Sequence, residues 1–302
     1  MFSERYQKAL AFKSLDVEEL IDRRFHRPLA AVFTALIGDL PIQPNHVTMM
    51  SLGSGWIGAF ALYQAFFNED IVTPFIWLIA GFFLFGSVIL DCADGQLARS
   101  RGGGSRAGRI LDGLVDVLVL LPTYVILGFG IKEFYGTFWI GVAAVAGFST
   151  WIHCVVYDKV KNLYLANTMP EAGGAEGAET VEAVRREFDE ARTGGSVLER
   201  ILLGIYLGYL HVQERFTSGS TENRQTVPDA EAIESYRREN RGTMRLASWL
   251  GLGTHMFLIY GCIALVAVLP EAILALQVVF ATIFNLVLII VLLRSRRFAK
   301  TP

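Results

Sequence analysis

The stretch "DCADGQLARSRGGGSRAGRILDGLVD", residues 91–116, directly follows the apolar segment "FIWLIAGFFLFGSVIL" (75–90). It contains four aspartates: Asp91, Asp94, Asp112 and Asp116. An ionised carboxylate is unfavourable beside lipid, and four of them close together would also repel one another. A chain that keeps four acidic groups there needs positive charge to compensate them.

The spacing of these aspartates indicates where that positive charge would sit. Asp91 and Asp94 are three residues apart, and Asp112 and Asp116 are four apart, so each pair lies on one face of a helix. The glycines at 102–104 can turn the chain back, so that the two pairs face each other. Oxygen ligands of this kind suit hard divalent cations, Mg²⁺ or Mn²⁺. Two such ions, bridged by carboxylates, typically clamp a phosphate and stabilise its transfer.

Composition places the chain among membrane proteins. Of its 302 residues, 53% are apolar and only 19% are charged, which is unlike a soluble domain. The net charge of −2 gives no indication of a nucleic-acid partner. The three cysteines, Cys92, Cys154 and Cys262, are too far apart in sequence to form a ligand cluster.

Hydropathy predicts six membrane spans. A spanning helix needs about 20 mostly apolar residues. Segments of this kind lie at roughly 47–67, 71–90, 110–130, 135–157, 245–268 and 271–293. Of the 27 Lys and Arg residues, only Lys132 falls in the turns that follow the first, third and fifth spans. By the positive-inside rule, both termini are then cytoplasmic.

The remaining segments complete an all-α integral membrane architecture. Residues 16–40 mix charge with apolar spacing and predict a helix along the cytoplasmic interface. The amphipathic segment 196–216 is predicted to lie on the interface as well, because a seventh span would put the basic C-terminus outside. The expected organisation is a cytoplasmic or interfacial N-terminal segment (1–46), spans one to four with the aspartate motif (47–157), a cytoplasmic insertion with a flexible linker (158–244), and spans five and six with a basic tail (245–302).

The spacing D-x2-D-G-x2-A-R-x8-G-x3-D-x3-D resembles the signature of the CDP-alcohol phosphotransferase (CDP-alcohol phosphatidyltransferase) family. The matching residues are Asp91, Asp94, Gly95, Ala98, Arg99, Gly108, Asp112 and Asp116. Members displace CMP from a CDP-linked alcohol and join the remaining phosphoryl group to an acceptor hydroxyl. The resemblance also implies two divalent ions, Mg²⁺ or Mn²⁺, and a homodimer.

The resemblance implies a role for each matching position. Asp91, Asp94 and Asp112 would hold one ion, Asp91, Asp112 and Asp116 the other, and Asp116 would also be the general base. Around the CDP group it implies Asp94, Gly95, Ala98, Arg99 and Gly108. "PNHVT" (44–48) is similar to the family's P-N-x-x-T element, which adds Asn45 and Thr48.

The substrates are less clearly indicated. "IDRRFHRPL" (21–29) with "LDCADGQLAR" (90–99) resembles bacterial phosphatidylinositol or inositol-phosphate lipid synthases. This implies CDP-diacylglycerol as donor, inositol or its phosphate as acceptor, and a site on the cytoplasmic face of a bacterial or archaeal membrane. A phosphorylated acceptor would need basic groups at cytoplasmic helix ends, for which the candidates are Arg106, Arg109, Lys159 and Lys161.

Three other readings remain open. One is transfer of phosphocholine or phosphoethanolamine from a CDP-amino alcohol to diacylglycerol. Another is a divalent-cation transporter, which would place acidic residues along several spans rather than at one face. The third is a non-catalytic scaffold, which gives no reason to keep all four aspartates.

Overall fold

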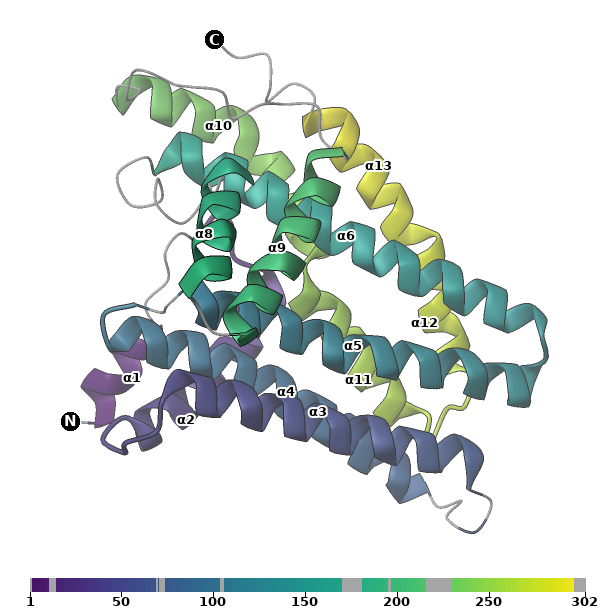
Figure 1. The fold of residues 1–302 in the computed structure, drawn as a ribbon. Coiled ribbons are helices and arrows are strands. Elements are labelled where there is room, and N and C mark those ends of the chain that lie inside the picture. The colour runs from purple at the N-terminus through teal and green to yellow at the C-terminus, as the bar shows by residue number, and fades with distance from the viewer. Residues whose placement is uncertain are drawn as a thin grey trace. The chain divides into compact units, whose positions relative to one another are not determined.

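The computed structural model of the chain describes residues 2–10, 15–68, 70, 74–103, 106–169, 181–194, 197–215 and 230–295. Every regular element within these ranges is helical (Figure 1), which confirms the all-α prediction. The predicted linker at 171–179 and most of the basic tail, from residue 296 onward, lie outside the described residues.

Five helical segments in the described part of the chain are long and apolar enough to cross a membrane. They are Pro74–Ser100, Ile110–Tyr135, Phe138–Thr168, Ala230–Leu265 and Ala272–Ser295. The protein is therefore an all-helical integral membrane protein. The first predicted span, 47–67, corresponds to a further helix of 24 residues, α3 (Pro44–Phe67), which is not among these five.

Helix α3 is less hydropathic because small and polar side chains form its contact face. The Ser51 hydroxyl donates to the Ser87 carbonyl oxygen at 2.9 Å. Gly58 lies so close to α4 (Pro74–Ser100) that an added Cβ would be 2.9 Å from the backbone nitrogen of Leu84. Small residues of this kind let membrane helices approach closely. The small and polar residues that lower the hydropathy of α3 are therefore the residues that pack it against α4.

Helix α3 also replaces a missing backbone hydrogen bond in its other neighbour, α5 (Arg106–Tyr135). Pro122 lies inside α5 and has no N–H to offer the carbonyl of Leu118, one turn earlier. The indole N–H of Trp56 donates to that carbonyl oxygen at 3.0 Å. A side chain of α3 therefore supplies the hydrogen bond that Pro122 removes from α5.

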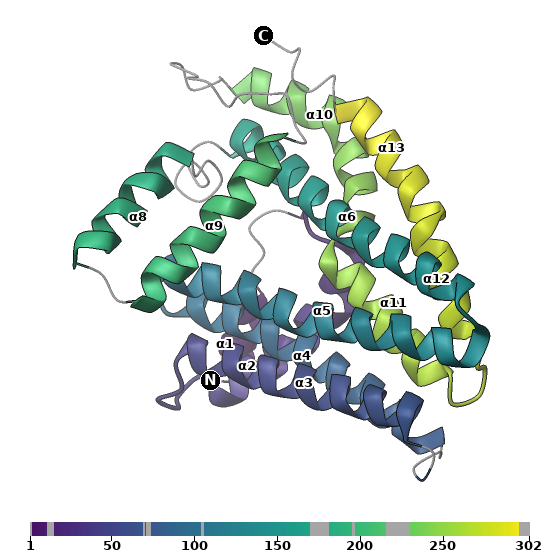
Figure 2. The same cartoon turned by 45° about the vertical axis from the view of Figure 1, so that its right-hand side comes forward.

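The chain divides into two compact units. The first consists of Met1–Lys13, Glu19–Trp151 and Leu252–Asn285, and the second of Ser14–Glu18, Ile152–Gly251 and Leu286–Pro302. Within the first unit, α4 packs between α3 and α11 (Leu252–Leu265), and α5 packs on α3 (Figure 2). Helices α1 (Phe2–Leu10) and α2 (Arg27–Ile37) contact α4.

Three predicted spans differ from the helices that the structure contains. Helix α6 (Phe138–Thr168) continues eleven residues past the predicted end of span four at residue 157, so that boundary falls inside a helix. The fifth predicted span is interrupted: α10 (Ala230–Ala247) and the 3₁₀ turn Ser248–Leu250 are followed by extended backbone at Gly251, and then by α11. The sixth is divided at Thr282 into α12 (Ala272–Ala281) and α13 (Ile283–Ser295).

The interruption before α11 is stabilised by acidic side chains from the N-terminal segment. The Glu19 carboxylate accepts hydrogen bonds from the backbone N–H groups of Gly253 and Thr254, at 3.3 and 2.7 Å, and from the Thr254 hydroxyl at 2.8 Å. A carboxylate at a helix N-terminus satisfies otherwise unbonded N–H groups and interacts favourably with the helix dipole. Burial, reinforced by the nearby Asp22 carboxylate, raises the pKa of Glu19 well above its ordinary value.

The same segment forms a second link to α11. His26, which is fully buried in the π-helical turn η1 (Asp22–His26), bridges Asp22 at 2.7 Å and the Tyr260 hydroxyl at 2.9 Å through its two ring nitrogens. We call these linked side chains, Glu19, Asp22, His26, Thr254 and Tyr260, the Glu19 network.

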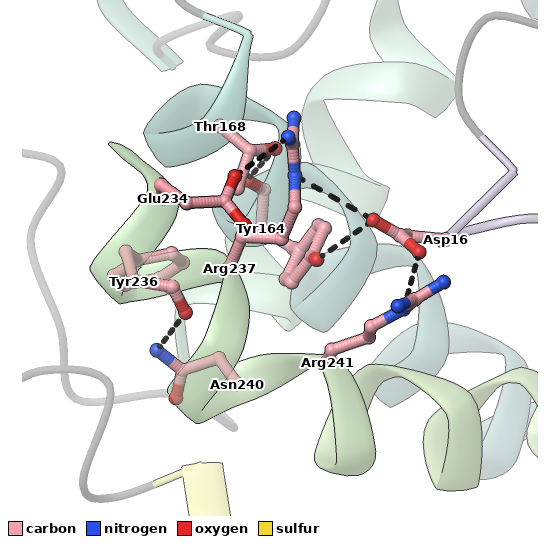
Figure 3. A network of polar contacts seen from close by, with 8 residues as sticks. All are labelled: Asp16, Tyr164, Thr168, Glu234, Tyr236, Arg237, Asn240 and Arg241. Atoms are coloured by element: carbon pink, nitrogen blue, oxygen red, sulfur yellow. Dashed lines mark hydrogen bonds and ion pairs between the residues drawn. The ribbon is translucent and has the colours of Figure 1, made fainter. Parts of the chain in front are cut away.

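The second unit contains the end of α6, α8 (Val181–Gly194), α9 (Val197–Arg215) and α10. Figure 3 shows Asp16 held by side chains of two of these helices. Its carboxylate accepts a hydrogen bond from Tyr164 on α6 at 3.2 Å and forms ion pairs with Arg237 and Arg241 on α10, at 3.6 and 2.8 Å. Residue 16 thus links α6 and α10 within this unit.

Candidate functional site

The four aspartates come from two neighbouring helix ends of the first unit. Asp91 and Asp94 lie in the last three turns of α4, and Asp112 and Asp116 lie in the first three turns of α5. Ligand oxygen atoms of Asp91, Asp94 and Asp112 all lie within 4.8 Å of one another. The Asp116 carboxylate is close enough to repel that of Asp91 electrostatically.

The turn between α4 and α5 depends on glycine. Gly102 and Gly103 have positive φ angles of 99° and 116°, which residues with a Cβ rarely adopt. The Gly103 N–H donates to the Ala98 carbonyl at 3.0 Å, and the Gly102 N–H donates to that of Arg99 at 3.2 Å. This pair of bonds is a Schellman motif, which ends α4. The third glycine, Gly104, lies outside the described residues.

The carboxylates are buried or half-buried, and they are incompletely satisfied. Asp94 is only 5% exposed, and its Oδ2 accepts a hydrogen bond from the Thr48 hydroxyl of α3 at 2.5 Å. One oxygen each of Asp91 and Asp112, Oδ1 in both, is buried without a hydrogen-bond donor among the described residues. Buried acidic oxygens left without donors are costly unless a cation completes their environment. This donor set, oxygen only and strongly negative, fits Mg²⁺ or Mn²⁺.

Arg99 is the basic residue among the eight motif positions. Its guanidinium interacts electrostatically with Asp94 and Asp112. Gly95, one turn earlier on α4, leaves room for it, because an added Cβ would be 3.2 Å from the Arg99 Nη1. The glycine therefore accommodates an arginine side chain of the same helix.

The other residues expected around CDP lie on α3, α4 and α5. Asn45 is exposed in the first turn of α3, one turn before Thr48. Ala98 is half-buried on α4, and Gly108 is half-buried in the first turn of α5, one turn before Asp112. Ala98 and Gly108 therefore lie at the helix ends that carry the aspartates, and Asn45 lies at the start of α3, whose Thr48 bonds to Asp94.

The four basic candidates for acceptor binding are placed differently. Arg106 and Arg109 lie in the first turn of α5, but their side chains are outside the part that the structure describes. Lys159 and Lys161 lie on the portion of α6 that belongs to the second unit. Lys161 forms an ion pair with Asp158 at 3.5 Å and lies over the Tyr157 ring, 5.3 Å from its centre.

Two polar residues of the motif stretch contribute contacts that the sequence pattern does not indicate. Gln96 is 1% exposed; its amide donates to the Arg27 carbonyl at 2.9 Å and accepts from the Thr34 hydroxyl at 3.2 Å. It thereby fixes α4 against α2. Arg101 bonds to the loop that precedes α3. In the sequence, Gln96 and Arg101 are marked only by being polar residues within the stretch that carries the four aspartates.

Fold and site together define a class: an all-helical integral membrane protein with an acidic cluster, at two adjoining helix ends, that could hold a metal ion. Residues 42–170 match the family model of the CDP-alcohol phosphatidyltransferases. The matched range spans α3 to α6 and includes all four aspartates. No curated protein and no solved structure matches the chain. The protein is therefore an enzyme that carries out phosphotransfer in phospholipid synthesis at a membrane.

Proposed function

We propose that the enzyme transfers the phosphatidyl group of CDP-diacylglycerol to a polyol, inositol or inositol phosphate, and releases CMP. The observation that carries the proposal is the convergence of Asp91, Asp94 and Asp112, with acidic oxygens left unsatisfied at the ends of α4 and α5. Such a cluster suits the charge of a metal-bound diphosphate. The choice of donor and acceptor rests on the resemblance of segments 21–29 and 90–99 to inositol lipid synthases.

We assign the ion ligands from the sequence motif and the cluster together. Asp91, Asp94 and Asp112 would hold one divalent ion, and Asp91, Asp112 and Asp116 a second. The bound ions, Mg²⁺ or Mn²⁺, would neutralise the diphosphate and stabilise the departing CMP. The Thr48 hydroxyl, bonded to Asp94, would orient that carboxylate toward its ion.

The side chains of the protein perform the remaining steps. Asp116 removes the proton of the acceptor hydroxyl, whose oxygen then attacks the phosphorus next to the diacylglycerol. The new P–O bond forms as the bond to CMP breaks, and the phosphodiester stays with the lipid. The planar donor fork of Arg99 suits the diphosphate. Asn45, Thr48, Asp94, Gly95, Ala98 and Gly108 would surround the nucleotide.

A phosphorylated acceptor would add a requirement for positive charge beside Asp116. Arg106 and Arg109 are favoured, because their positions in the first turn of α5 lie one to three turns before Asp112 and Asp116. Lys159 and Lys161 are weaker candidates, since Lys161 is already paired with Asp158.

Orientation and assembly follow the distribution of charge and the family resemblance. Both termini and the aspartate cluster would face the cytoplasm of a bacterial or archaeal cell, with the insertion 158–244 on the same side. The functional form would be a homodimer in contact with membrane lipids.

The proposal is tested by measuring CMP release from detergent-purified full-length protein with Mg²⁺ or Mn²⁺. CDP-diacylglycerol is supplied with inositol, inositol phosphate, glycerol phosphate or serine, and CDP-choline or CDP-ethanolamine is supplied with diacylglycerol. We expect release with CDP-diacylglycerol and inositol or its phosphate. Release only with a CDP-amino alcohol would contradict the proposal and reverse which substrate is the lipid.

A further inference from the structure

The loop at residues 38–43 leads from α2 into α3 and so sets where α3 begins. Ile42 packs against an apolar cluster that includes Val47 of α3 and Ala93 and Leu97 of α4. At the start of α3, the Gln43 N–H donates to the ring of His46 at 3.3 Å, and the His46 N–H donates to the Gln43 carbonyl at 3.0 Å. The first turn of α3 is therefore continuous with an ordered loop that rests on α4.

Arg101 reaches this loop from the end of α4. It is the residue before Gly102, and the Schellman motif fixes its backbone at the end of the helix. Its Nη1 donates to the Ile42 carbonyl at 2.6 Å, and its Nη2 donates to the Leu40 carbonyl at 3.0 Å. Two nitrogens of one planar guanidinium thus bind two carbonyls that are two residues apart. A lysine ammonium cannot reproduce this bidentate geometry.

A second cross-link joins the same elements closer to the aspartates. The Thr48 hydroxyl of α3 donates to Asp94 of α4, about one turn beyond Asn45. The first turn of α3 is thus held to α4 on both sides, by Arg101 before it and by Thr48 after it. Asn45 lies between these two cross-links.

We propose that Arg101 is a positioning residue for the nucleotide end of the active site. This inference rests on the proposed function, in which Asn45 and Thr48 contact CDP. Arg101 directs two of its donors to backbone carbonyls, so it acts through the loop and the first turn of α3. Without it, the loop retains its apolar contact through Ile42 and the ion pair of Asp39 with Arg5 but loses its hydrogen bonds to α4, so Asn45 and Thr48 are held less firmly for binding.

Kinetics test this role through the separation of KM from kcat. In the full-length protein, Arg101→Ala is expected to raise the KM for CDP-diacylglycerol about tenfold, which corresponds to one lost charge-assisted hydrogen bond, and to change kcat by less than about twofold. Arg101→Lys should recover part of the loss, since an ammonium can reach one carbonyl. Arg238→Ala, which removes an exposed arginine of α10, is the matched control and should leave KM unchanged.

A double variant separates positioning from direct contact with the substrate. If Arg101 acts through Asn45, the effects of Arg101→Ala and Asn45→Ala on KM overlap, and the double variant is no worse than about the stronger single one. Multiplying effects, or a fall in kcat with KM unchanged, would overturn the proposal.

Amide hydrogen exchange keeps the test independent of turnover. Arg101→Ala should speed exchange at residues 38–47 and leave α5 around Val119 unchanged, whereas Arg238→Ala should change neither. Unchanged exchange in the loop would refute the cross-link even in an active enzyme. If exchange is faster in Arg101→Ala but the wild type releases no CMP, the cross-link is confirmed and the proposed function is wrong.

Discussion

The first unit contains two groups of buried and half-buried acidic side chains: the four aspartates of α4 and α5, and Glu19 and Asp22 of the Glu19 network. In the Glu19 network, the protein supplies the donors: two backbone N–H groups and a hydroxyl for Glu19, and His26 for Asp22. In the aspartate cluster, Thr48 bonds to Asp94, but one oxygen each of Asp91 and Asp112 has no donor among the described residues. The carboxylates of the Glu19 network have donors within the protein, whereas the aspartate cluster keeps acidic oxygens without donors in the described part of the chain and could hold a metal ion.

The largest expected effect concerns catalysis. Asp116→Asn removes the proposed base and should lower kcat for CMP release by about 10²- to 10⁴-fold, the range typical of a general base. The first Mn²⁺ should keep its affinity, because its ligands Asp91, Asp94 and Asp112 remain, whereas the second loses one of its three carboxylates and should bind more weakly. The measurement compares turnover with Mn²⁺ affinity in the same preparation. Unchanged turnover would contradict the assigned base.

Removing a carboxylate should stabilise the protein in the aspartate cluster and destabilise it in the Glu19 network. Asp112→Asn removes one charge from mutually repelling carboxylates and keeps the side-chain volume. In metal-free detergent solution it should raise the stability of the protein by roughly 1 kcal/mol or more. Thermal unfolding in the presence of a chelator measures this. A lower Tm than wild type would show that the carboxylates are satisfied without a cation.

Glu19→Ala should act in the opposite direction. It leaves the Gly253 and Thr254 N–H groups at the start of α11 without their acceptor, at an expected cost of about 1–3 kcal/mol. The exposed ion pair of Arg5 with Asp39 provides the control, since Asp39→Ala should cost about 1 kcal/mol or less. Equal Tm values for the two variants would contradict the assigned role of Glu19 as the cap of α11.

The smallest expected effect is a dependence of stability on pH. The pKa of Glu19 is raised in the folded protein, so folding favours its protonated form. Stability should therefore fall as the pH rises from the ordinary glutamate value, about 4.3, toward the raised value. Glu19→Gln lacks this titration, so its Tm should vary less with pH over that window. Parallel Tm curves for the two proteins would show that Glu19 titrates normally.

The sequence predicts the aspartate cluster because it depends on local spacing. Separations of three and four residues put Asp91 with Asp94, and Asp112 with Asp116, on common helix faces, and the glycines at 102 and 103 allow the turn between them. The helical class and the apolar spans follow from hydropathy in the same way.

The Glu19 network and the Arg101 cross-link are not predictable from local pattern. Glu19 bonds to Thr254 across 235 positions, and Arg101 bonds to Ile42 across 59. A glutamate or arginine in a charged segment is usually a solvated side chain, and only tertiary packing shows otherwise. The interruption at Gly251 is also not predictable from the sequence, because the segment around it is apolar enough to be predicted as one continuous span.

We propose that the aspartates bind divalent cations and that the Glu19 network does not. The most direct test is to count bound Mn²⁺ by electron paramagnetic resonance during titration of the wild type, Asp112→Asn and Glu19→Gln. The wild type and Glu19→Gln should bind about two ions per chain with equal affinity, and binding to Asp112→Asn should be strongly weakened. Equal binding of Mn²⁺ by the wild type and Asp112→Asn would contradict the proposal that the aspartates hold the ions.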